Sequence, residues 1–124
     1  MITGAVLADE GRIRLTVRGS RGRERDIEAV VDTGYTSWLT LPPDVIAALS
    51  LQWLSLDRAT LADGSEVEFD VYAAKVLWDG RVRSVFVDKA DADPLVGMAL
   101  LKGYELKMQI RTRGKVTIKK LARR

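Results

Sequence analysis

The residues with the clearest catalytic potential form one short run, Asp32-Thr33-Gly34. Every second position from Ile27 to Val31 is apolar, which is typical of a strand with one buried face. The strand therefore ends by presenting a carboxylate at its tip. Thr33 adds a hydroxyl beside that carboxylate, and Gly34 allows a tight turn or a close backbone approach. A carboxylate in such a position can act as a general acid or base.

The chain contains neither histidine nor cysteine. This composition excludes a Ser-His-Asp triad, a cysteine nucleophile and any metal site built on His or Cys ligands. Catalysis is left to carboxylates, hydroxyls, lysines and metal sites made of Asp and Glu alone. The acidic run from Asp88 to Asp93 lacks the glycine and the distal glutamate of a calcium loop. We interpret it as a polar connector, and we expect no metal and no cofactor.

Strands must carry most of the fold, because apolar and polar residues alternate along much of the chain. Its 124 residues suit one compact domain. The pattern predicts strands at Met1–Leu7, Arg12–Arg18, the segment before Asp32, Trp38–Leu41, several stretches between Leu54 and Val87, and a last hairpin of Tyr104–Ile110 and Lys115–Leu121.

Two short helices interrupt these strands. Pro42-Pro43-Asp44 favours a helix start, so a helix is predicted over Val45–Leu49. A second helix is predicted over Met98–Lys102, with Gly103 as its stop. Trp53 falls in the connector after the first helix, and we expect it in the core or in a pocket wall.

Three segments resemble the retropepsin-like (clan AA) aspartic proteases, and they fall in the order of that family. Val30-Val31-Asp32-Thr33-Gly34, followed by Leu39-Thr40-Leu41-Pro42, resembles the catalytic loop. The stretch Pro94–Leu101 resembles the apolar segment, glycine and helix near the family's C-terminus. Ala62-Asp63-Gly64-Ser65 lies where the family carries its flap. Bacterial and archaeal single-domain members are the nearest in pattern.

The resemblance implies a mainly all-β fold: a closed, retropepsin-like β-barrel with one or two short helices, one lobe per chain, over residues 1–124. It implies an aspartic endopeptidase with Asp32, Thr33 and Gly34 as catalytic residues. Asp63, Gly64 and Ser65 would bind substrate as the flap. Such proteases use two acids that share one proton, and this chain has one Asp-Thr-Gly. The active enzyme is therefore expected to be a homodimer.

Two departures concern the viral members of that family. They follow the catalytic glycine with Ala and Asp, and their C-terminal helix begins Gly-Arg, whereas this chain has Tyr35 and Met98 at the matching places. The viral mode of dimer support therefore does not carry over. Tyr35 is also bulky beside Gly34, and we expect it to narrow the cleft.

The repeat that the family is known for is faint here. In the first half of the chain a strand leads into Val-Val-Asp-Thr-Gly and then a helix. In the second half a strand leads into Pro-Leu-Val-Gly and then a helix. We place the second-half loop at Leu95–Gly97, where the chain has no acid. Each chain therefore contributes one carboxylate to the predicted pair.

Two alternative functions remain open at this stage. One is a catalytically silent retropepsin-like module for peptide binding or dimerisation. The other is a basic β-barrel that binds nucleic acid through the segments 12–25 and 111–124, which are rich in Arg and Lys. These segments lack interleaved aromatic residues, and the net charge is only +3, so we do not expect nucleic acid as a partner.

The expected partners are a second copy of the chain and a peptide or protein substrate. We expect no membrane contact, because the longest apolar run, near Leu95–Leu101, is too short to cross a bilayer. The first residues lack the charge and apolar pattern of a signal peptide. A cytoplasmic location is the resulting expectation.

Overall fold

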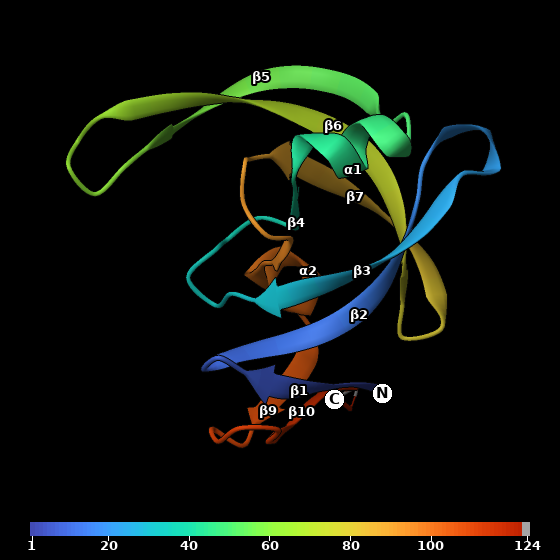
Figure 1. Cartoon of the computed structure of the whole chain (residues 1–124), viewed down its shortest axis with the longest axis vertical. Coiled ribbons are helices and arrows are strands. Elements are labelled where there is room, and N and C mark those ends of the chain that lie inside the picture. Colours follow the sequence, from blue (N-terminus) through green and yellow to red (C-terminus); the bar gives the residue numbers. More distant parts are fainter. Residues whose placement is uncertain (123–124) are drawn as a thin grey trace.

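The computed structural model describes residues 1–122 and is built mainly from strands (Figure 1). Arg123 and Arg124, the last of the predicted basic positions, lie outside the described residues. The strands are β1 (Ile2–Leu7), β2 (Glu10–Arg18), β3 (Glu24–Val31), β4 (Leu39–Leu41), β5 (Gln52–Thr60), β6 (Glu66–Trp78), β7 (Arg81–Lys89), β8 (Leu95–Val96), β9 (Tyr104–Met108) and β10 (Lys115–Lys120). The helical segments are η1 (Ser20–Gly22), α1 (Pro43–Ala48) and α2 (Met98–Leu101).

The described strands join one sheet that closes on itself. Their order is β5-β6-β7-β4-β8-β3-β2-β1-β10-β9, and β2 also pairs with β6. This extra pairing closes a ring of β2, β3, β8, β4, β7 and β6, which confirms the predicted closed barrel. In Figure 1, β5 and β6 form a long arm above the ring, and β1, β10 and β9 lie below β2.

The core follows the alternation that the sequence predicts. On β2, Ile13, Leu15 and Val17 are buried, whereas the residues between them face outward. The largest fully buried side chain is Trp78, at the end of β6. Its ring packs on the ring of Tyr104 in an edge-to-face arrangement. The barrel interior is therefore filled by side chains of alternate strand positions.

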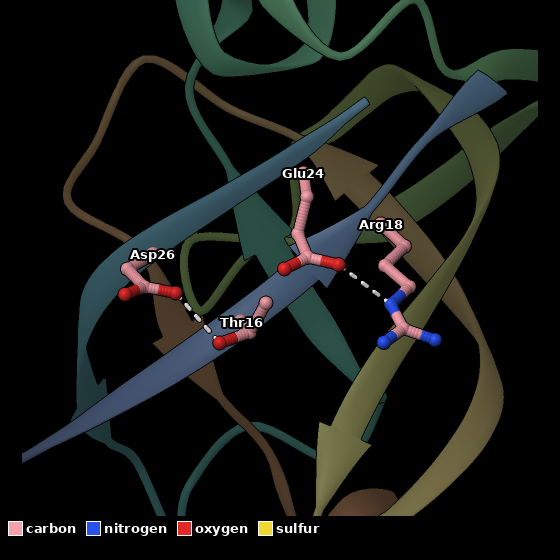
Figure 2. A network of polar contacts seen from close by, with 4 residues as sticks. All are labelled: Thr16, Arg18, Glu24 and Asp26. Atoms are coloured by element: carbon pink, nitrogen blue, oxygen red, sulfur yellow. Dashed lines mark hydrogen bonds and ion pairs between the residues drawn. The ribbon is translucent and has the colours of Figure 1, made fainter. Parts of the chain in front are cut away.

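The outer face of β2 and β3 is held by polar pairs between opposite residues (Figure 2). The Thr16 hydroxyl donates to Asp26 at 2.6 Å, and the Arg18 Nε donates to Glu24 at 2.8 Å. Both pairs are solvent-exposed, so each contributes little to stability. The bond to Glu24 orients the Arg18 side chain along the outer face.

Trp53 is the clearest difference from the sequence-based expectation. It belongs to β5, not to a connector, and 55% of its surface is exposed, so the predicted core position is wrong. Its indole N–H donates to Asp70 on the neighbouring strand at 3.0 Å. A large aromatic residue is usually at least half-buried, but β5 is an edge strand whose residues are mostly exposed along its whole length.

The last hairpin is shorter than predicted. β9 ends at Met108 because the chain turns over Gln109–Gly114, where it bonds to Val6 on β1. The Val6 N–H donates to Gly114 O, and the Arg113 N–H donates to Val6 O, both at 2.8 Å.

No helix within residues 1–122 is long and apolar enough to span a membrane.

Candidate active site

Asp32 follows directly on β3 and is held by backbone contacts on both sides. Its N–H donates to Val96 O on the parallel strand β8 at 2.9 Å. Its Oδ1 accepts a hydrogen bond from the Gly34 N–H at 2.9 Å. Asp32 is half-buried, while Thr33 and Gly34 are exposed. One carboxylate oxygen is thus fixed by the loop itself, and the run of three residues forms one compact turn.

Gly97 is the residue against which this loop packs. A Cβ at Gly97 would lie 2.2 Å from Ser37 O and 2.6 Å from Cδ2 of Tyr35, so no side chain fits there. The Gly97 N–H donates to Trp38 O at 3.1 Å, and the Met98 N–H donates to Tyr35 O at 2.8 Å. The glycine of the second sequence match therefore lets the Asp32 loop cross the end of β8 in close contact.

Tyr35 links the Asp32 loop to β7 through a side-chain hydrogen bond. Its hydroxyl donates to the carboxylate of Asp88 at 2.6 Å, in a half-buried position, and its ring lies beside Gly97. Burial, and then the hydrogen bond to Asp88, raises the pKa of Tyr35 well above its ordinary value. The sequence analysis placed Asp88 in a polar connector, which is wrong, because Asp88 belongs to β7. Its role as the partner of Tyr35 was missed because a partner on a distant strand leaves no local signal in the sequence.

Asp63, Gly64 and Ser65 form the turn at the tip of the β5–β6 arm. The Ser65 N–H and hydroxyl both donate to Oδ1 of Asp63, at 2.9 and 2.5 Å. The hydroxyl bond, followed by the backbone bond, lowers the pKa of this fully exposed carboxyl. Gly64 has φ +84°, a left-handed conformation that favours glycine. The turn is therefore specified by all three residues.

The predicted flap and the predicted catalytic loop remain separate in a single chain. Figure 1 shows the tip of the β5–β6 arm and the loop after β3 on the same side of the molecule. Within residues 1–122 no hydrogen bond or ion pair joins the two segments. That part of the chain also holds no group of three His, Cys, Asp or Glu side chains that could bind a metal ion.

The strand pairing makes the internal repeat clear. β3 pairs in parallel with β8, and β7 pairs in parallel with β4; α1 follows β4 and α2 follows β8. β8 is therefore the counterpart of β4, and the counterpart of the Asp32 loop is the connection 90–94, not Leu95–Gly97. Asp91 and Asp93 in this connection are exposed. Within residues 1–122, neither carboxylate receives a backbone hydrogen bond of the kind that Gly34 gives Asp32.

The closed barrel, the repeated strand-loop-strand-helix unit and the loop crossing at Gly97 define a retropepsin-like fold. Several solved structures share it, among them two proteases. EIAV protease, solved in complex with the inhibitor HBY-793, aligns with a TM-score of 0.57 and 16% identity over 77% of this chain and 88% of its own. A retropepsin-like aspartic protease from Rickettsia conorii aligns with a TM-score of 0.58 and 17% identity over 98% of this chain and 91% of its own.

Sequence comparison adds nothing to this likeness. No family model matches the chain. No curated protein matches it either. At 16% and 17% identity the likeness establishes the fold, and function must be argued from the residues of the site.

Proposed function

We propose that this protein is an aspartic endopeptidase whose active site contains Asp32 from each of two copies of the chain. The observation that supports this most directly is the carboxylate of Asp32. It is half-buried and accepts a hydrogen bond from Gly34 at 2.9 Å, on the loop that follows β3 of a retropepsin-like barrel. Fixing one oxygen leaves the other oxygen of Asp32 to act on a water molecule.

The proposed reaction needs two carboxylates with one proton between them. Two acids close together cannot both be ionised, so one is a base and the other an acid. The ionised Asp32 takes a proton from water, the water oxygen attacks the peptide carbonyl carbon, and the protonated Asp32 gives its proton to the carbonyl oxygen. The tetrahedral intermediate then collapses as a proton passes to the amide nitrogen, which leaves as an amine.

The second carboxylate is supplied by a partner copy in this proposal. Within one chain the acids of the counterpart loop, Asp91 and Asp93, lack the backbone support that Asp32 has. Among the described strands, both edges of β1 and of β10 are occupied by other strands of the same chain, and the sheet ends at β9 and at β5. Because β5 belongs to the proposed flap arm, a dimer that continues this sheet would extend it through β9. Met98, exposed beside the Asp32 loop, provides an apolar contact next to that loop.

The turn Asp63-Gly64-Ser65 is the proposed substrate-binding flap. One face of its arm carries the apolar residues Ala59, Val67 and Phe69, with Asp57 opposite Phe69 as the charged member of that face, and the other face carries charged pairs such as Arg58 and Glu68. An arm with one mainly apolar face suits an extended peptide that binds beneath it as an added strand.

The test of this proposal is whether the Asp32→Asn variant still hydrolyses peptides. Wild type, Asp32→Asn and the control Asp91→Asn are incubated with a mixed library of apolar peptides at acidic pH, and mass spectrometry detects the cleaved bonds. Asn keeps the shape of the side chain but cannot share a proton, so Asp32→Asn should be inactive and Asp91→Asn fully active. Wild-type cleavage by Asp32→Asn would refute the assignment, and peptide binding without cleavage by wild type would favour a silent binding module.

A further inference from the structure

A cavity of about 350 Å³ opens where β2, β6 and β7 meet. Arg18 of β2, Lys75 of β6 and Ser84 of β7 line it, and they are direct neighbours across the three strands. Its volume lies in the range of small-molecule sites. Of the lining residues, Trp38 is the last residue of the loop that follows Asp32, just before β4, and none of those described belongs to Asp32-Thr33-Gly34 or to the flap turn. The cavity therefore contains none of the proposed catalytic or flap residues.

Two cations face each other in this cavity. Arg18 and Lys75 are directly paired across β2 and β6, an arrangement of like charges that destabilises a sheet. Glu24 engages only Nε of Arg18, and Figure 2 shows the two other guanidinium nitrogens pointing away from that carboxylate. Within residues 1–122, Lys75 forms no ion pair. Two cations and one carboxylate leave one positive charge uncompensated.

Aromatic rings form another part of the wall. Trp38 is half-buried, and Phe86 exposes 53% of its surface. The Arg83 guanidinium lies 5.4 Å from the centre of the Trp38 ring and holds that ring in place. The rim is also fixed, because the Ser20 N–H donates to Leu49 O at 3.2 Å. A rigid wall of this kind favours a flat apolar group next to an anion.

We propose that this cavity binds an organic carboxylate that carries an aromatic ring. The carboxylate accepts hydrogen bonds from the free guanidinium nitrogens of Arg18, from Lys75 and from the Ser84 hydroxyl, and the ring packs on Trp38 and Phe86. A monoanion matches the one charge left uncompensated at the Arg18–Lys75 pair. Arg83, which packs on Trp38 and has no ion pair within residues 1–122, adds to the attraction for an anion.

Such a carboxylate has two possible sources, a free aromatic acid or the C-terminal residue of a peptide. The probes are N-acetyl-phenylalanine and N-acetyl-Ala-Ala-Phe, each as the free acid and as the amide, with acetate as the ring-free anion. Binding to the ¹⁵N-labelled full chain is followed by NMR through the amides of Lys75, Ser84 and Phe86. Saturable shifts with both free acids would show that a carboxylate and a ring are sufficient for binding. Saturable shifts with the peptide acid alone would identify the C-terminal residue of a peptide as the ligand.

Variants separate this site from general charge effects. Lys75→Met removes the charge and keeps the length, and we expect it to weaken binding of the acids about tenfold or more. Lys119→Met is the matched control, because Lys119 is an exposed strand lysine outside the cavity, and it should leave binding unchanged. Equal binding of acid and amide, equal shifts with acetate, or unchanged binding by Lys75→Met would overturn the proposal. The same titration with Asp32→Asn should match wild type. The proposed binding site is therefore tested independently of the proposed proteolysis.

Discussion

Gly97→Ala is the substitution for which the structure gives the sharpest expectation. The backbone at Gly97 is extended, with φ −100° and ψ 177°, so alanine is compatible with the local conformation. The added Cβ, however, would lie 2.2 Å from Ser37 O and 2.8 Å from Tyr35 O. Both neighbours are backbone carbonyls and cannot rotate away, so the catalytic loop itself must move.

The cost has two parts. Overpacking in a rigid setting destabilises by about 1–3 kcal/mol, and weakening the hydrogen bonds that Gly97 and Met98 donate to the loop adds about 1 kcal/mol. The free energy of unfolding should therefore fall by about 3 kcal/mol, which for a chain of this size lowers Tm by roughly 10 °C. Peptide cleavage should be lost as well, because Asp32 lies on the displaced loop.

Thermal unfolding followed by circular dichroism, at one fixed protein concentration, measures the effect. Gly34→Ala is the matched control, because within residues 1–122 its added Cβ would come close to Asp32 Oδ1 alone, at 3.3 Å, and Gly34 needs no left-handed backbone. It should change Tm by less than about 4 °C. A Tm of Gly97→Ala equal to that of Gly34→Ala would show that the loop does not pack on β8 as described.

Three further predictions concern the shared site and its support. Specific activity should fall when the protein is diluted below its dimer dissociation constant, and excess Asp32→Asn should inhibit wild type through mixed dimers; constant activity where sedimentation detects only monomers would contradict the shared site. Activity against pH should follow a bell on the acidic side of neutral, because one proton must stay on the Asp32 pair, and a rate that rises steadily into alkaline solution would contradict it. Tyr35→Phe should cost about 1–2 kcal/mol of stability in urea unfolding at neutral pH, because it leaves the half-buried Asp88 without its donor. Since folding raises the pKa of Tyr35, the contribution of Tyr35 to the free energy of unfolding is complete below about pH 10 and is lost as pH rises further. Tyr35→Phe should therefore show a flatter alkaline decline in stability than wild type. An equally steep decline would count against this role.

Local patterns predicted most strands and the two short helices because each depends on neighbouring residues. The alternation on β2 and the proline that opens α1 both have their cause within a few positions. The sequence also placed Asp32 at the end of a strand and Gly64 in a turn, as observed. Whether these residues catalyse and bind substrate remains a prediction.

Other features depend on parts of the chain that meet only after folding. The hydrogen bond from Tyr35 to Asp88 joins β7 to the catalytic loop, and neither residue signals the other in the sequence. The contacts of Tyr35 with Gly97 and with Asp88 were likewise not foreseen from its place beside Gly34, and that it narrows the cleft remains a prediction. Trp53 was misplaced because its burial depends on whether another layer covers β5, which no local pattern reveals.

The closure of the barrel at β2 and β6 has a consequence for how the chain folds. Thr16–Arg18 must find Lys75–Leu77, about half the chain away, before the ring is complete. Strands with such distant partners form slowly, and until they pair they expose edges that other chains can bind. Val17 and Val76, both fully buried at this junction, should therefore be protected only once the whole barrel exists. Their amides should exchange hydrogen through global unfolding, whereas those of the β5–β6 arm exchange while the barrel stays closed.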